Sequence, residues 1–215
     1  MRPRHPIAAL SAAVLTMMLL AGSPPVMAGV PSGATSQMPS CLALCPFGDL
    51  PFSVVVRDLA NNPIAGSSVV LDFSACPGAW LCRSSGDPNV VVDLTSRTVR
   101  AFTGASGAVS IAAHVGGTGP AGSVRVFADG VLLRSYALAS PDQDGDGFVV
   151  SIIGQDDPIF AAKLGSADPT ADLDCSGLVD IDDEQIFFFH HSQACDGYVD
   201  AIRRSSWAGL KLHYR

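Results

Sequence analysis

The chain contains little charge and few basic residues. Charged residues make up 15% of its 215 residues, Lys and Arg together number 13, and the net charge is −7. A nucleic-acid-binding protein needs clustered Lys and Arg to neutralise phosphates, so this balance argues against that class. The low charge, with 21 Gly and 15 Pro, also excludes a coiled coil and favours short strands and turns.

Glutamate is almost absent, since Glu184 is the only one in the chain. Glycoside hydrolysis needs two carboxylates that face one bond, and no Ser lies in a Gly-x-Ser-x-Gly elbow. We therefore expect a protein without catalytic activity of its own. The alternative is a small hydrolase or hydrolase-associated subunit, for which a cleft would have to hold two of Asp49, Asp72, Asp87 and Asp93.

The acidic residues that are present are concentrated in one stretch. Residues 29–141 carry equal numbers of acids and bases, whereas residues 142–200 carry fourteen acids and a single base, Lys163. The last fifteen residues, 201–215, add four positive charges. The reason why the acids gather in this stretch is therefore the main clue to the function of the protein.

The N-terminus has the pattern of a secretory signal. Arg2 and Arg4 precede an apolar run that ends near Gly22, and small residues lead to a cleavage position after Ala28. We expect residues 1–28 to be removed and the mature protein to be secreted or held at the cell surface. The alternative is an uncleaved anchor, although a spanning helix needs about 20 apolar residues. No later segment is apolar enough to span a bilayer.

An exported chain with six cysteines predicts disulfides. The cysteines form two groups, one in each half of the chain: Cys41, Cys45, Cys76 and Cys82, then Cys175 and Cys195. Zinc is the alternative for the first group, but no His lies beside it and the spacings do not match known zinc motifs. Pairing within each group is the simplest expectation. The connectivity of the first four is left open, and Cys175 paired with Cys195 would tie an acidic loop to the segment that follows it.

Short alternating apolar and polar runs predict an antiparallel two-sheet sandwich in the first half. Asp129-Gly130 predicts a two-residue hairpin between the last two runs, because both residues tolerate positive φ. The expected strands are 52–58, 67–73, 89–94, 98–103, 108–115, 123–128 and 131–137.

Residues 45–140 resemble a bacterial immunoglobulin-like domain of the invasin type. The resemblance rests on the segments that begin at Phe52, Thr103 and Gly122. It implies an immunoglobulin-like β-sandwich that serves as a spacer, stalk or adhesion unit. The Cys76–Pro88 insertion departs from the family pattern.

The acidic stretch contains a twelve-residue loop with the spacing of a calcium site. Ca²⁺ prefers six to eight oxygen ligands, which alternate residues of a tight loop can direct inward, with a Gly at position 6. Gly177 occupies position 6, and Cys175 at position 4 is expected to face away from the ion. The predicted ligands at positions 1, 3, 5, 7 and 12 are Asp172, Asp174, Ser176, the Leu178 carbonyl and Asp183.

A second copy of the loop begins thirty residues upstream, at Asp142. Its predicted ligands at positions 1, 3, 5 and 7 are Asp142, Asp144, Asp146 and the Phe148 carbonyl. Position 12 falls on Ile153, which cannot coordinate an ion. A three-residue insertion would bring Asp156 to that place, because Asp156 precedes Phe160 by four residues as Asp183 precedes Phe187. Asp157 is the other candidate.

Each loop is followed by an expected helix, 156–164 and 182–190, and the two loop–helix units together resemble a type I dockerin. The resemblance implies two Ca²⁺ ions and calcium-dependent docking onto a cohesin-like partner of an extracellular polysaccharide-degrading complex. The family's recognition positions carry Ser151 and Ile152 in one copy and Ile181 and Asp182 in the other. Because the copies differ, a calcium-stabilised cap, or a calcium-stiffened surface adhesin without a cohesin partner, is the alternative.

The expected organisation is therefore mainly β with a small α-helical part. The expected segments are a signal peptide at 1–28, a cysteine-containing segment at 29–44, a sandwich at 45–140, a dockerin-like module at 141–195 and a basic tail at 196–215. Phe187 is expected to be buried, with at least one of its two following Phe residues exposed. His190 and His191 could bind a metal, but the sequence shows no partner ligands for them, so we expect a solvated pair.

Overall fold

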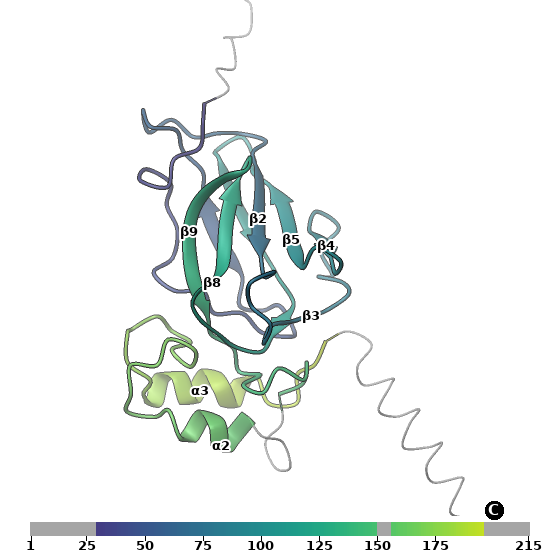
Figure 1. Cartoon of the computed structure of the whole chain (residues 1–215), viewed down its shortest axis with the longest axis vertical. Helices are drawn as coiled ribbons and strands as arrows, with labels where there is room; N and C mark the ends of the chain where they lie inside the picture. The colour runs from purple at the N-terminus through teal and green to yellow at the C-terminus, as the bar shows by residue number, and fades with distance from the viewer. Residues whose placement is uncertain (1–28, 150–155, 196–215) are drawn as a thin grey trace, which may run out of the picture.

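The computed structural model describes residues 29–149 and 156–195 and places a β-rich body above two short helices (Figure 1). The expected signal peptide and basic tail lie outside the described residues. Within the described ranges, no helix is long and apolar enough to cross a membrane. The strands are β1 (Phe52–Val55), β2 (Ser68–Asp72), β3 (Trp80–Leu81), β4 (Val91–Asp93), β5 (Thr98–Phe102), β6 (Ala108–Ile111), β7 (Val115–Gly116), β8 (Gly119–Ala128) and β9 (Val131–Leu138), and the helices are α2 (Asp156–Ala161) and α3 (Ile181–Phe189).

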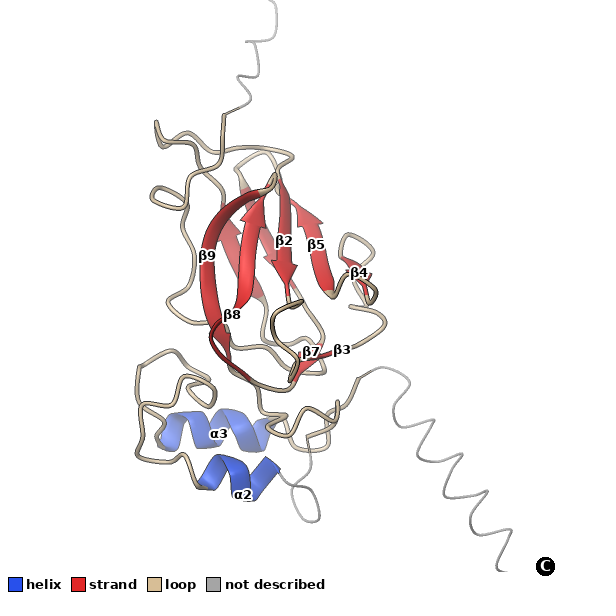
Figure 2. Cartoon of the chain, viewed as in Figure 1, coloured by secondary structure: helices blue, strands red, loops and turns tan. Residues whose placement is uncertain are grey.

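All strand pairs are antiparallel. The main sheet has the order β4-β5-β2-β8-β9, while β1 pairs with β6 and β3 pairs with β7 in two separate ribbons. The hairpin prediction is confirmed, because Asp129 and Gly130 join β8 to β9 with φ values of 46° and 82°. In Figure 2 the β3–β7 ribbon lies between the main sheet and the helices.

The alternating sequence pattern accounts for the core of this β-rich body. Alternate residues of each strand point to one face, and in β2 these are Val69 and Leu71, both fully buried. They belong to one apolar cluster with Phe52 of β1 and Ile111 of β6. The β1–β6 ribbon therefore packs against the main sheet through a shared core.

Several expected strands differ in length from those observed, and two of the differences change the pairing. The run expected to continue to Val115 ends at Ile111, and Val115 starts the separate strand β7, which pairs with Trp80 and Leu81 inside the insertion after Cys76. Alternation alone missed this break, because residues on both sides of it are apolar and buried. Strand β8 also begins four residues earlier than expected, at Gly119.

The helical part has a separate, smaller core. Phe160 of α2 stacks on Phe187 of α3 with ring centroids 4.4 Å apart, and both rings are buried. Phe188 and Phe189 are exposed, as expected for at least one of them. Ala139, which follows β9, joins this cluster and forms a parallel bridge with Ala43. The N-terminal segment therefore contacts both parts of the protein.

Disulfides are present, as expected, but the pairing expected within each half is wrong and two of the six cysteines are unpaired. Cys41 pairs with Cys175 and Cys82 pairs with Cys195, while Cys45 and Cys76 are free and buried. The reason is spatial, because the end of the β-rich body packs against the acidic loops and brings cysteines distant in sequence together. Both bridges therefore join the first half of the chain to the second.

Candidate metal centres

The second acidic loop gathers the carboxylates expected from its spacing. Carboxylate oxygens of Asp172, Asp174 and Asp183 lie within 4.8 Å of one another. Gly177 has φ of +90°, which produces the sharp turn after position 5. Ser176 lies at the exposed side of the loop, and its hydroxyl donates to the Leu178 carbonyl at 3.0 Å. Three of the five predicted ligands, the carboxylates, thus face one small volume.

The first loop gathers Asp142, Asp144 and Asp146 in the same way, with one oxygen of each within 4.8 Å of the others. Asp142 is fully buried, and its carboxylate accepts hydrogen bonds from the backbone N–H groups of Gly145 and Gly147, each at 2.8 Å. Phe148 follows directly, at the position expected to offer a carbonyl.

Asp156 and Asp183 close the two loops with the same hydrogen bonds. In each case one carboxylate oxygen accepts from the backbone N–H groups at loop positions 2 and 3. The distances are 2.6 and 3.1 Å for Asp156, from Gln143 and Asp144, and 2.6 and 3.1 Å for Asp183, from Leu173 and Asp174. Asp156 therefore lies where the insertion hypothesis puts it, although Ser151, Ile152 and Ile153 fall outside the described residues. The rival candidate, Asp157, instead pairs with His191 at 3.3 Å.

The duplication extends beyond the ligands to the backbone pairing of the whole module. Val149 and Val179, both at loop position 8, are buried and pair with the segment that follows the helix of the other copy. Each such segment starts with a residue of positive φ, Gly165 at 77° or Ser192 at 68°. The bonds are Gly165 N to Val179 O, Val179 N to Ser166 O, Ser192 N to Val149 O and Val149 N to Gln193 O, all 2.8–2.9 Å. The two loop–helix units therefore interlock reciprocally.

The protein alone supplies little positive charge to balance the negative charge of the carboxylates in the first loop. Burial, with added repulsion from Asp156 and Asp146, raises the pKa of Asp142 to about 7. Burial and the charge of Asp183 likewise raise the pKa of Asp172. A cation between these oxygens would supply the missing positive charge. The oxygen-only donor set fits a hard divalent ion such as Ca²⁺.

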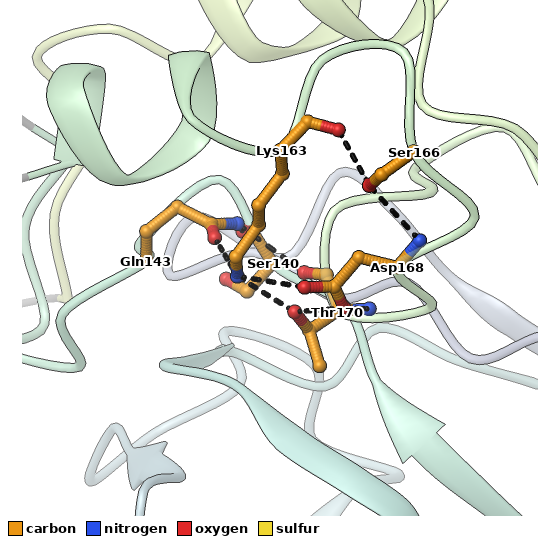
Figure 3. Close-up of polar contacts among 6 residues, drawn as sticks. All are labelled: Ser140, Gln143, Lys163, Ser166, Asp168 and Thr170. Atoms are coloured by element: carbon orange, nitrogen blue, oxygen red, sulfur yellow. Dashed lines mark hydrogen bonds and ion pairs between the residues drawn. The ribbon is translucent and has the colours of Figure 1, made fainter.

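Lys163, the single base of the acidic stretch, joins the two copies without entering either loop (Figure 3). Its ammonium group donates to Gln143 Oε1 and Thr170 Oγ1, both at 2.7 Å, and lies 3.8 Å from Asp168. Burial lowers the pKa of Lys163. Gln143 belongs to the first loop, and Thr170 lies just before the second, so this lysine fixes their spacing.

The first loop also packs closely against the β3–β7 ribbon. A Cβ added at Gly116 in β7 would collide with the Asp142 carboxylate, and one added at Gly147 would stand 2.7 Å from Trp80 Nε1. The second loop is attached differently, because Cys175 at its position 4 is bonded to Cys41. Each loop therefore contacts the β-rich body at a different place.

The sequence reasoning missed a third cluster, formed by Cys45, Asp49 and His190. The expectation that His190 is solvated is wrong, because it is 2% exposed. Burial and a hydrogen bond to Asp49 raise the pKa of Cys45 to about 12. The four-residue spacing of Cys45 and Asp49 was visible, but nothing in the sequence pattern brings His190 to them across 141 residues.

The four carboxylates considered for hydrolysis have separate interaction partners. Asp72 pairs with Arg125 at 2.7 Å, and Asp87 and Asp93 accept hydrogen bonds from backbone N–H groups of their own turns. Asp49 belongs to the cluster with Cys45.

Comparison with known proteins gives no relative from which a function can be transferred. No family model matches the chain, and neither a characterised protein nor a solved structure matches it.

Proposed function

We propose that this is an exported, non-catalytic calcium-binding protein in which two duplicated loops hold Ca²⁺ and organise a dockerin-like docking module. The observation that carries the proposal is the pair of equivalent backbone hydrogen bonds that Asp156 and Asp183 each accept in their own loops. If the acids were clustered on the surface by chance, two separate segments would not be expected to form equivalent hydrogen bonds. Reciprocal pairing through Val149 and Val179 adds independent support.

In this proposal the side chains of Asp142, Asp144, Asp146 and Asp156, with the Phe148 carbonyl, hold the first ion. Asp172, Asp174, Ser176 and Asp183, with the Leu178 carbonyl, hold the second. The helical part has only a small apolar cluster of its own. Bound calcium would offset the repulsion among its carboxylates, so metal binding would contribute directly to folding free energy.

The docking role is supported by apolar side chains exposed on the second loop and its helix. Ile181 is 60% exposed, Phe188 52% and Phe189 72%. Exposed large apolar residues that are grouped mark interaction surfaces more often than isolated ones do. Ile181 also occupies one of the positions through which dockerins recognise cohesins, so we propose a cohesin-like partner on this side.

Surface plasmon resonance against an immobilised type I cohesin tests the docking role. We expect binding in calcium that is lost in chelator and weakened about tenfold by Ile181→Asp. Leu132→Asp is the matched control, because Leu132 is also exposed but lies on β9 of the main sheet. Calcium titration of both variants checks that the loops are intact. Equal binding by the two variants would contradict a role for Ile181.

The second candidate is a calcium-stiffened adhesin or stalk without a cohesin partner. The two disulfides that fasten the second half of the chain to the first favour it, because a rigid joint is what a stalk requires. Under this alternative, calcium raises the thermal stability of the chain while no cohesin binds.

A further inference from the structure

A compact cluster of unlike donor atoms lies at the junction of the two parts of the protein, apart from both acidic loops. Cys45 Sγ lies 2.7 Å from Asp49 Oδ1, and the same oxygen lies 3.1 Å from His190 Nε2. The three donor atoms all fall within 4.8 Å of one another. Sulfur, carboxylate oxygen and imidazole nitrogen therefore converge on one point.

The hydrogen bonds behind the cluster orient these donors toward that point. His190 Nδ1 lies 2.6 Å from the Ile186 carbonyl, so with the ring donating there its other nitrogen, Nε2, is the one that faces Asp49 and can coordinate a metal. A backbone carbonyl behind the ring is the usual arrangement for a histidine that binds a metal. The Gly48 N–H donates to Cys45 Sγ at 3.2 Å, and Gln193 Nε2 donates to Asp49 Oδ2 at 3.2 Å.

Asp49 is the centre of this arrangement. Burial opposes its ionisation, but hydrogen bonds from Cys45 and Gln193 hold its pKa below the usual value, so it offers a carboxylate to a cation. A metal ion would accept electrons from this carboxylate, from Nε2 of His190 and from the thiolate of Cys45. The combination of S, N and O donors suits Zn²⁺, which takes Cys, His and Asp ligands, far better than it suits Ca²⁺.

The cluster is also accessible from solvent. Asp49 and His190 line a surface pocket of about 580 Å³, together with Leu50, Asp182, Gln185 and Phe189. Cys45 is buried behind them and, unlike four of the six cysteines, is not in a disulfide. Three protein ligands beside an open pocket leave room for a fourth ligand, such as water.

We propose that Cys45, Asp49 and His190 form a zinc site that joins the two parts of the chain. Cys45 and Asp49 precede β1, whereas His190 follows α3, so one ion would link segments that are far apart in the sequence. The ion displaces the thiol proton and binds Cys45 as a thiolate, with no change in oxidation state. This site is separate from the calcium loops and does not depend on them.

Cobalt is the direct probe, because Co²⁺ substitutes for Zn²⁺ and a thiolate ligand gives a characteristic near-ultraviolet charge-transfer absorption. The wild-type chain, with its disulfides intact and in excess calcium, is titrated with Co²⁺ and then with Zn²⁺. We expect the absorption to saturate at one Co²⁺ per chain and to disappear as Zn²⁺ displaces it. Binding of Co²⁺ without this absorption, or no binding, would overturn the proposal.

Matched variants assign the ligands. Cys45→Ser should abolish the thiolate absorption, and His190→Gln should weaken zinc binding by about tenfold or more. Cys76→Ser replaces the other free cysteine and His191→Gln the adjacent histidine, and both should bind zinc as the wild type does. A Cys76→Ser protein that loses the absorption while Cys45→Ser retains it contradicts the assignment. The wild-type cobalt spectrum remains decisive if a variant does not fold.

Discussion

Cys41 and Cys175 are bonded across 134 residues, and Cys175 occupies position 4 of the second acidic loop. Alternation of the loop ligands turns this position away from the ion, and Cys175 is not one of the gathered metal-binding groups, so the bridge can hold the loop without displacing a ligand. Cys175 also has φ of +67°, a conformation that the closed loop maintains. The geometry of the proposed calcium site and the attachment of the module are therefore fixed by the same residue.

Removal of this bridge should lower both stability and calcium affinity. We expect Cys41→Ser with Cys175→Ser to reduce the free energy of unfolding by about 2–5 kcal/mol, because a long unfolded loop is no longer constrained. Calcium binding at the second loop should weaken as well, since the loop must then be ordered by the ion alone. Urea unfolding and calcium titration measure the two effects. Cys76→Ser, which removes no disulfide, is the control, and an unchanged calcium affinity in the double variant would contradict the coupling.

Gly116→Ala should weaken calcium binding at the first loop by about tenfold, a size typical of changes next to a metal ligand. The added Cβ would collide with the Asp142 carboxylate, which must move. Isothermal titration should show one weakened site and one unchanged site. Gly104→Ala is the control, because its Cβ would meet only Ala108 O at an ordinary 3.7 Å. Two unchanged sites in Gly116→Ala would show that Asp142 is not a ligand.

Asp156→Ala should weaken binding at the first loop, whereas Asp157→Ala should not. Asp156 accepts two backbone hydrogen bonds inside the loop, but Asp157 pairs with His191 outside it. The adjacent residues thus provide a matched pair on the same helix. Asp172→Ala with Asp174→Ala should remove the second site and should weaken total binding more than Asp156→Ala. If Asp157→Ala caused the larger loss, the assignment of the closing ligand would be wrong.

The β-rich body should show an acid-dependent contribution from Asp72. Burial opposes ionisation of this carboxyl, but hydrogen bonds from Ser74 and the charge of Arg125 outweigh it and hold the pKa of Asp72 below its usual value. An acid with a lowered folded-state pKa stabilises the fold above its unfolded-state pKa of about 4, and this contribution is lost as the pH falls through the folded-state value.

Asp72→Asn should therefore cost about 0.5 kcal/mol at pH 7, a small value because Arg125 is 40% exposed and solvent screens the pair. The difference from the wild type should shrink toward zero at about pH 2, well below the usual pKa. Urea unfolding of both proteins at the two pH values provides the measurement. If the difference in unfolding free energy between the two proteins grew on acidification, folding would raise the pKa of Asp72 instead of lowering it. That result would refute the stabilising role of the Asp72 carboxylate.

Local patterns predicted the local features well. Alternation located most strands of the main sheet, and Asp129-Gly130 placed its hairpin, because strand faces and tight turns depend on neighbouring residues. The loop spacing likewise identified carboxylates that the structure brings together. The equivalence of Asp156 and Asp183 was accessible only through their matching distances to Phe160 and Phe187, whose rings stack at the centre of the module.

Long-range contacts could not be predicted in this way. The disulfide partners of Cys41 and Cys82 lie more than a hundred residues away, and no local signal specifies which cysteines the packed parts will bring together. The same limit applies to His190, which reaches Cys45 only because α3 ends against the segment before β1. The split between β6 and β7 was missed because buried residues continue across it.

Calcium titration of the full chain at neutral pH, by isothermal calorimetry after chelator treatment, tests whether the two loops are calcium sites. We expect two Ca²⁺ to bind per chain, Asp172→Ala with Asp174→Ala to leave one, and calcium to raise the thermal unfolding temperature by binding the folded state. No binding at about 1 mM Ca²⁺, the weak end of extracellular calcium sites, together with an unfolding temperature unchanged by chelator, would contradict these expectations.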